Sequence, residues 1–341
     1  MPDTHNTQGT RDTQGTEEQV EGPEPSSPPP SPALRRVLDR VAAENDTPLL
    51  DLLSSRLSGA DLTTLLLEVY RRRARDVTPA EVMRRYRTDR FVGPSATPYP
   101  AMRRAEDALL SALPSEVDVV TLAPLTPLAA HSSVATVDPY KVVATIRNTE
   151  VAADPTNALA LEAASRRFRL LSRDPHSARP VHLAASQRVV RAQQFDGPGA
   201  PSPPAHFQLL GYVSAGRDVG GRTFERETLA AHLRFGAEAL AAFGIGETTI
   251  RVTLLDPAFE PVLDHVTTAL ADLPGTRVVP DPTRESGRGY YSGLCFKVHA
   301  DDWEIGDGGF TDWTAQLLGN RKERFLISGY GVDRLTAKLS A

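Results

Sequence analysis

Three glycine-rich stretches near the end of the chain decide the fold. They are Gly-Arg-Gly-Tyr-Tyr-Ser-Gly (287–293), Gly-Asp-Gly-Gly-Phe-Thr-Asp (306–312) and Gly-Tyr-Gly-Val-Asp-Arg-Leu (329–335). Glycine has no Cβ, so a neighbouring strand or a ligand can approach its backbone closely. Tyrosine, aspartate and arginine side chains occur within the same stretches. The pattern therefore indicates strands that line a binding site.

The bulk composition describes a globular protein with a substantial core. The chain has 341 residues, 40% of them hydrophobic, and a formal net charge of −5. A net negative charge argues against a protein that wraps nucleic acid by bulk electrostatics. Arginines cluster at 71–75 and 84–87, and such runs are usually the solvated faces of helices.

The single cysteine, Cys295, excludes an internal disulfide and fits a reducing cytoplasm. It lies in an apolar run, which favours packing over a nucleophilic role. One cysteine and eight histidines without paired spacing do not form a zinc site, so we expect no protein-held metal. The chain shows neither a secretory leader nor an apolar run of about 18 residues, so a cytoplasmic protein is predicted.

Composition and periodicity predict three regions. Residues 1–31 are rich in Thr, Gln, Glu, Ser and Pro and are expected to be a disordered tail. Apolar residues at helical spacing, with a capping-box start at Thr78-Pro79-Ala80-Glu81, predict a small helical extension over 32–92. Residues 93–341 form the third region. Strands connected by long loops, with helices interspersed, predict an α+β fold with a mixed or antiparallel sheet there.

Upstream of the glycine stretches, two strand-like runs carry an arginine and an aromatic residue. Val189-Val190-Arg191-Ala192-Gln193 is followed by a proline- and glycine-containing loop and then by His206-Phe207-Gln208. Together with Arg334, this order resembles the catalytic core of a class II aminoacyl-tRNA synthetase. In pattern it is similar to histidyl-tRNA synthetase and to the regulatory subunit of ATP phosphoribosyltransferase. No anticodon-binding domain is expected after Leu335.

The resemblance implies a site for ATP and Mg²⁺. Arg191 is expected to contact the α-phosphate and the substrate carboxylate, Phe207 to stack on adenine, and Arg334 to hold the γ-phosphate. Gln193 stands where the family commonly has a glutamate that accepts from the adenine amino group. Guanidinium groups suit this chemistry, because their planar fork binds phosphate oxygens with two parallel hydrogen bonds.

The resemblance also implies an amino-acid pocket. Asp154 and Thr156 correspond to the acidic residue and threonine that hold a substrate α-ammonium, although either also fits the N-cap of the helix that follows. Tyr290 and Tyr291 correspond to the tyrosine pair of the histidine-binding motif. Adjacent residues of a strand point to opposite faces, so at most one of these tyrosines is expected to line the pocket.

One feature of histidyl-tRNA synthetase is out of register. The catalytic arginine that lies four positions before the tyrosine pair falls on Ser286 here, with Arg284 and Arg288 nearby. Histidine is therefore a poor prediction for the substrate. Glu150, Gln208 and Asp312 are further polar candidates for the pocket wall, each equally suited to a surface or capping position.

The function expected from these features is ATP-dependent activation of an amino acid, or a related carboxylate, as an adenylate. The acyl group would pass to a carrier protein, a small amine or a modified macromolecule rather than to tRNA. The family dimerises through a helix and strand that match Ala101–Leu113 and Val117–Leu122, so a homodimer is expected. The alternatives are a catalytically inactive regulatory or ligand-binding subunit, and genuine tRNA aminoacylation with the N-terminal basic helices holding tRNA.

Overall fold

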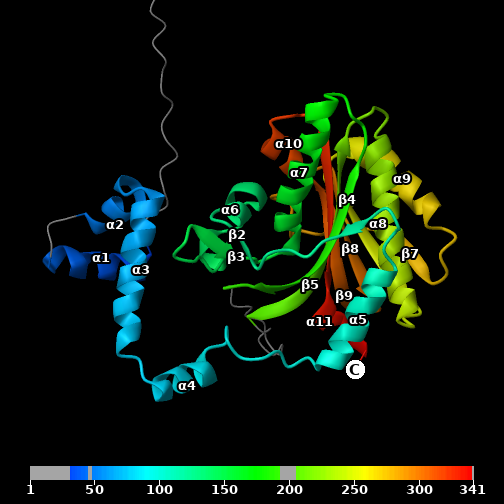
Figure 1. The fold of residues 1–341 in the computed structure, drawn as a ribbon. Coiled ribbons are helices and arrows are strands. Elements are labelled where there is room, and N and C mark those ends of the chain that lie inside the picture. Colours follow the sequence, from blue (N-terminus) through cyan, green and yellow to red (C-terminus); the bar gives the residue numbers. More distant parts are fainter. Residues whose placement is uncertain (1–30, 45–47, 193–204, 340–341) are drawn as a thin grey trace, which may run out of the picture. The chain divides into compact units, whose positions relative to one another are not determined.

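The computed structural model describes residues 31–44, 48–192 and 205–339 (Figure 1). The expected tail, apart from its last residue, lies outside the described residues, as does Gln193. Contacts divide the chain into two compact units, Met1–Leu62 and Thr63–Ala341. The boundary expected at residue 92 therefore stays a prediction. Across the described residues, every helix is too short or too polar to cross a membrane.

An eight-stranded mixed sheet organises the larger unit (Figure 1). Its outermost neighbours pair in parallel, β1 with β4 and β6 with β7, and all other neighbours are antiparallel. This confirms the predicted α+β fold. In spatial order the strands are β1 (Asp118–Val119), β4 (Val181–Val190), β5 (His206–Arg217), β10 (Glu323–Gly331), β9 (Trp303–Thr311), β8 (Leu294–Ala300), β6 (Thr248–Leu254) and β7 (Thr276–Pro280).

Helices cover both faces of this sheet (Figure 1). One face carries α6 (Ala130–Ala135), α7 (Pro155–Arg173) and α10 (Trp313–Leu318), and the other carries α5 (Tyr99–Ser111), α8 (Thr223–Ala242) and α9 (Glu260–Ala269). Each face has its own hydrophobic cluster of buried residues. The short helix α11 (Val332–Leu339) follows β10 directly and packs against α5.

Smaller elements complete the larger unit. A separate two-stranded sheet pairs β2 with β3, and two single turns of 3₁₀ helix are present. These elements are β2 (Leu125–Pro127), β3 (Thr149–Val151), η2 (Pro139–Lys141) and η3 (Pro257–Phe259). The face of the sheet under α7 is fastened to that helix by a fully buried ion pair, in which Arg167 donates to Glu323 at 2.8 Å.

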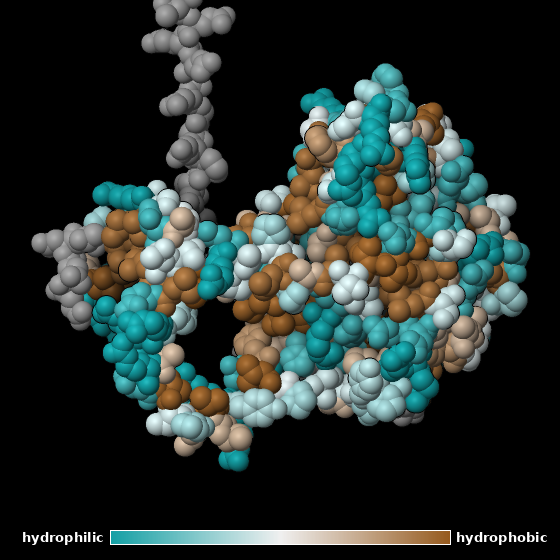
Figure 2. Space-filling view, viewed as in Figure 1, coloured by the Kyte–Doolittle hydropathy of each residue, from teal (hydrophilic) through white to brown (hydrophobic). Residues whose placement is uncertain are grey.

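The N-terminal helices differ from the rest of the protein in having almost no buried side chains. They are α1 (Pro32–Glu44), α2 (Leu49–Asp51), η1 (Leu52–Arg56), α3 (Gly59–Arg75) and α4 (Pro79–Thr88). Among their described residues, none is buried. Thr78 caps α4 through the N–H of Glu81, as the sequence predicted. Figure 2 shows hydrophobic side chains on the surface of these helices.

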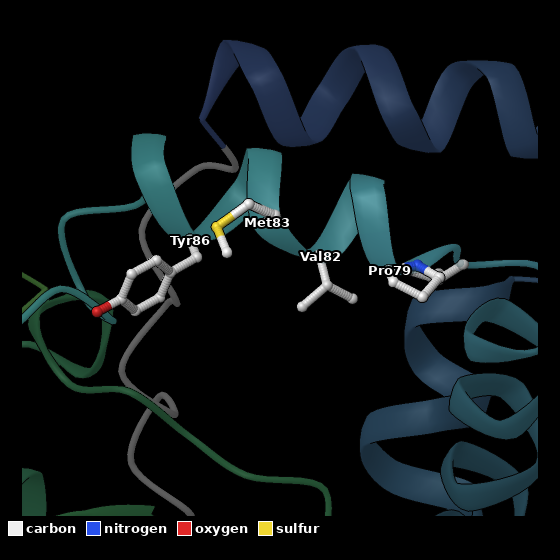
Figure 3. A pocket seen from close by; sticks show the side chains of 5 residues that line it. Pro79, Val82, Met83 and Tyr86 are labelled. Atoms are coloured by element: carbon white, nitrogen blue, oxygen red, sulfur yellow. The ribbon is translucent and has the colours of Figure 1, made fainter.

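The arginine clusters are solvated helix faces, as expected. Glu68 pairs with Arg71 and Arg72 on α3, and Glu81 pairs in the same way with two arginines on α4. An apolar groove of about 570 Å³ runs beside α4, lined by Val77, Pro79, Val82, Met83 and Tyr86 (Figure 3). These side chains are apolar apart from the hydroxyl of Tyr86, so the groove lacks a cluster of polar groups.

Candidate functional site

The side of the sheet that faces α7 carries the predicted site residues. An added Cβ at Gly211 of β5 would lie 3.1 Å from Pro155, so this position faces α7. Gly329 of β10 pairs with Gly211 and therefore faces the same way. Residues two apart in a strand share a face, which adds Gly331. An added Cβ at Gly331 would lie 3.1 Å from the Cβ of Arg334, so Arg334 lies over the α7 face.

Arg191 lies just beyond the end of β4, on the same face. Its Nε donates to the carbonyl of Ala153 at 2.9 Å, and Nη2 donates to the Asp154 carboxylate at 3.1 Å. Its guanidinium carbon is 5.1 Å from the ring centroid of Phe207, in the range of a cation–π contact. Arg191 and Phe207, two of the residues predicted to bind the nucleotide, are thus in contact.

The two arginines share one end of the sheet as well as one face. Phe207 lies two residues before Leu209, and Leu209 pairs with Gly331, beside Arg334. The guanidinium of Arg334 donates to the carbonyl of Glu304 at 2.8 Å. Its side chain is 55% exposed. The side chains are therefore not on opposite sides of the sheet, which is the condition that a shared nucleotide requires.

Between these arginines lies a stretch of open backbone. Among the described residues, an added Cβ at Gly329 would meet only the carbonyl of Asp307, at 4.0 Å. By contrast, an added Cβ at Gly308 would lie 2.4 Å from the carbonyl of Ile327. The glycine at 329 is thus not required by packing, and it leaves room for a flat group against the strand.

Asp154 caps α7, which is one of the two roles that the sequence left open, and its role toward a substrate ammonium stays a prediction. One carboxylate oxygen caps α7, accepting from the N–H of Thr156 at 2.9 Å and from its hydroxyl at 2.7 Å. The other oxygen faces Arg191. Thr156 is buried and its hydroxyl is engaged in the cap, so it supports Asp154 rather than offering a free donor.

A buried histidine–glutamate pair, which sequence reasoning missed, fixes the backbone before Asp154. The N–H of Ala153 donates to Nε2 of His131 at 3.0 Å, so the ring proton must be on Nδ1, which donates to Glu150 at 2.5 Å. Glu150 also accepts the backbone N–H groups of Ala129 and His131. Burial alone would raise the pKa of Glu150, but these hydrogen bonds hold it below its usual value. Glu150 therefore supports the site from behind and does not form its wall.

The tyrosine pair departs from the sequence expectation. Tyr290 and Tyr291 do not lie in a strand, because both backbone N–H groups donate to the carbonyl of Gly287 in a turn. Their ring centroids are 4.3 Å apart, and both pack in the cluster on the α7 face. The prediction that they point to opposite faces is wrong for this reason.

Each tyrosine contacts the charged groups of the pocket differently. The Tyr291 hydroxyl donates to the carboxylate of Asp307. Burial, together with the negative charges of Asp307 and Asp154, raises the pKa of the partly exposed Tyr290 to about 12.

Arg284 occupies the space beneath the tyrosine pair. Its three nitrogens donate to the carbonyl of Ser286 at 2.7 Å, to the carbonyl of Phe296 at 2.9 Å and to the Asp307 carboxylate at 2.7 Å. Only 3% of its side chain is exposed. Burial raises the pKa of Asp307, and Arg284 opposes that shift. Arg288 instead donates to backbone carbonyls in an exposed turn.

Two predicted pocket residues are not part of this cluster. Gln208 points to the α5 face, where its amide donates to Ser186 at 3.0 Å, because it alternates with Phe207 along β5. Asp312 lies at the opposite end of the sheet, where it accepts from Gln316 at 2.7 Å. It lines a separate hollow of about 650 Å³. Both residues were candidates because they are polar, and strand alternation in β5 and the length of β9 place them elsewhere.

Mg²⁺ fits this site only as an ion that arrives with phosphates. Among the described residues, no group of three or more histidine, cysteine or carboxylate side chains is arranged to hold a metal. In nucleotide sites Mg²⁺ is bound through one or two carboxylates together with substrate phosphates. Glu304, whose side chain lies 3.8 Å from Arg334, is a carboxylate suitably placed for that arrangement.

Comparisons with known proteins identify the fold. No protein-family model matches the sequence, and no curated protein matches it. Three similar solved structures cover 73% of this chain with TM-scores of 0.51–0.53 and 14–15% identity. They are an ATP phosphoribosyltransferase regulatory subunit/histidyl-tRNA synthetase from Bacillus halodurans (82% of that chain covered), a histidine–tRNA ligase subunit from Alicyclobacillus acidocaldarius (95%) and a histidyl-tRNA synthetase from Nostoc (75%). At this identity the likeness is one of fold, and it confirms the resemblance to a class II synthetase catalytic core.

Proposed function

We propose that this protein activates an amino acid, or a related carboxylate, as an adenylate at the expense of ATP, and passes the acyl group to an acceptor other than tRNA. One observation carries the proposal. Arg191 with Phe207, and Arg334 with Glu304, flank the open backbone at Gly329 on one face and one end of the sheet. Such an arrangement supports the binding of a nucleoside triphosphate across the strand ends.

The reaction places its demands on these side chains. A substrate carboxylate oxygen attacks the α-phosphorus, a new P–O bond forms, and the bond to pyrophosphate breaks. Negative charge grows on the phosphoryl oxygens as this happens, so fixed cations that meet it accelerate the step. Arg191 is assigned to the α-phosphate and the substrate carboxylate, Phe207 to adenine and Arg334 to the γ-phosphate. Bound Mg²⁺ would neutralise further phosphate charge.

The amino-acid end is assigned to the α7 N-terminus. The outward oxygen of Asp154 bonds to Arg191 and is available to accept from a substrate α-ammonium. A carboxylate next to an ammonium in a half-buried site is a strong charge-assisted contact. Tyr290 packs against Tyr291, whose hydroxyl donates to Asp307, so we assign Tyr290 to the space for the substrate side chain. We assign the acceptor as a carrier protein, a small amine or a modified macromolecule.

A regulatory or ligand-binding subunit is the second candidate. It is favoured by Arg284, whose nitrogens all bond to the protein, and by the serine at the expected arginine position. Such a subunit would bind an amino acid without forming an adenylate. Genuine tRNA aminoacylation is a third candidate, and a gel shift with total tRNA tests it. The family likeness also makes a homodimer part of the proposal, which sedimentation of the purified chain tests.

The deciding experiment is amino-acid-dependent exchange of labelled pyrophosphate into ATP, run across the twenty standard amino acids. We expect exchange with at least one of them, and a loss of about 10²-fold in Arg334→Ala, the size seen when one charge-stabilising donor is removed. Arg277→Ala is the matched control, because Arg277 is an exposed arginine on β7, paired with Glu247. Both variants should melt within a few degrees of the unmodified protein, because exposed ion pairs contribute little stability.

The possible outcomes separate the candidates. Amino-acid binding by calorimetry without any exchange would favour the regulatory subunit. Undiminished exchange in Arg334→Ala would show that the nucleotide site is elsewhere.

A further inference from the structure

The segment that joins α4 to α5 crosses the same end of the sheet as the proposed nucleotide site. We call residues 90–97 the clasp. Arg90 donates to the carbonyl of Ala192 at 2.7 Å. His206 Nε2 lies 2.6 Å from the carbonyl of Gly93 and must donate to it, since a carbonyl only accepts. Ala192 follows Arg191 directly, and His206 precedes Phe207.

The ring of His206 is held from both sides. Since Nε2 carries the proton for Gly93, Nδ1 is left to accept, and the Nε of Arg188 donates to it at 2.9 Å. The start of β5 is thus fixed between the clasp and β4. Because Phe207 is the next residue in the chain, this contact also fixes the position of its backbone.

The third contact of the clasp is with Asp333, which precedes Arg334. The hydroxyls of Ser95 and Thr97 donate to one carboxylate oxygen at 3.1 and 2.7 Å. The other oxygen accepts the backbone N–H of Gln208 at 2.5 Å. Only 15% of the Asp333 side chain is exposed. A mostly buried carboxylate needs such donors, so the first turn of α11 is tied to both the clasp and β5.

We propose that the clasp is a positioning element, which aligns the three chain segments that carry Arg191, Phe207 and Arg334. These residues come from distant parts of the sequence, and one continuous segment bonds to the immediate neighbour of each. That the aligned site takes ATP rests on the proposed function. The alignment itself rests on the contacts above.

The clasp also joins the N-terminal helices to the site. α4 ends at Thr88, two residues before Arg90. The backbone N–H of Phe91 bonds to the Asp89 side chain at 2.9 Å, so the chain turns from the helix into the clasp without a long linker. A change at the end of α4 therefore reaches the clasp within a few residues.

The test is a pair of substitutions at Thr97 in the full chain. Thr97→Val keeps the shape and removes the hydroxyl that reaches Asp333, whereas Thr97→Ser keeps the hydroxyl. Hydrogen–deuterium exchange should rise about fivefold in Thr97→Val in peptides covering 206–210 and 332–336, as expected when a charged acceptor loses one donor. Thr97→Ser should exchange like the unmodified protein, and peptides from α8 should not change in either variant.

Nucleotide affinity is the second measurement. Calorimetry should show about tenfold weaker ATP binding in Thr97→Val and restored binding in Thr97→Ser. Unchanged hydrogen–deuterium exchange in Thr97→Val, or a rise spread evenly over the whole sheet, would refute the positioning role of the clasp. If the unmodified chain does not bind ATP, the proposed function fails, and the exchange data still decide whether the clasp aligns these segments.

Discussion

Gly329 offers the sharpest test of the site, because the structure separates its packing role from its binding role. The residue lies in β10 between the two arginine groups. Within the part of the chain that the structure describes, only the Asp307 carbonyl, at 4.0 Å, lies near the place a Cβ would occupy. Its φ is not in the left-handed region. Gly329→Leu should therefore be accepted by the fold, with its side chain in the space assigned to the nucleotide.

The expected magnitudes run in opposite directions for stability and binding. Replacing a strand glycine without strain removes freedom from the unfolded chain and should stabilise by about 0.5–1 kcal/mol. Displacing a bound group by about 1 Å or more should reduce pyrophosphate exchange by about 10²-fold, which is about 2.8 kcal/mol at 1.4 kcal/mol per decade. The same kind of change at Gly308, where a Cβ would lie 2.4 Å from the Ile327 carbonyl, should destabilise by about 1–3 kcal/mol.

The assay combines urea unfolding with pyrophosphate exchange and ATP calorimetry. Gly246→Leu is the control, since an added Cβ there meets no described atom within 4 Å, and Gly246 precedes β6, three strands away from β10 in the sheet. We expect Gly329→Leu to be at least as stable as the unmodified chain and inactive, and Gly246→Leu to be stable and active. A stable Gly329→Leu with normal ATP binding would refute the reasoning, because a nucleotide cannot share that space with four added carbons.

Three further predictions concern the support of the site. Arg167→Ala should destabilise by about 3–5 kcal/mol in urea unfolding, because Glu323 is left buried without its partner; an equally stable variant would contradict this. His131→Asn should raise the KM for ATP with less effect on kcat. His131→Gln should leave this KM unchanged, because glutamine can still accept from the N–H of Ala153; equal effects of the two substitutions on KM would contradict the assignment. Burial lowers the pKa of His232 well below 6.5. Below about pH 6.5 the unfolded chain gains a proton that the folded chain resists, so stability should fall by up to about 1.4 kcal/mol per pH unit; His232→Gln should lose this component, and an unchanged slope would contradict it.

Arg191, Phe207 and Arg334 were identified from the order of the motifs, through the resemblance to a class II synthetase core. The structure brings all three to one face and one end of the sheet, and their binding of a nucleotide stays a prediction. No local rule predicts which polar group meets a given side chain across a turn. His131 lies in the short helix α6, and its partners are visible only once β3 and α6 are in place.

The amino-acid end was harder to predict for a related reason. Asp307 was one letter in a glycine-rich pattern, and its importance appears only when the turn before β8 brings Arg284 and Tyr291 to it. Treating 290–291 as part of a strand gave the wrong facing for the tyrosines. Asp312 fits the same pattern but follows β9 at the far end of the sheet, since a nine-residue strand separates its two ends by about 30 Å.

The arginines at the two ends of the site differ in how many of their N–H donors already bond to the protein. This difference bears on the choice between the candidate functions. A guanidinium has five N–H donors. In its contacts with the described residues, Arg191 uses Nε and Nη2, and the half-exposed Arg334 uses Nη1, so both keep donors for phosphate oxygens. Arg284 uses all three nitrogens on the protein and is almost fully buried. Under the proposed function these two arginines would bind the nucleotide, while Arg284, the arginine nearest the tyrosines, is committed to the fold. It follows that ATP binding should persist without any amino acid, and that Arg284→Lys should reduce stability more than it changes ATP affinity, as unfolding and calorimetry on the same samples would show.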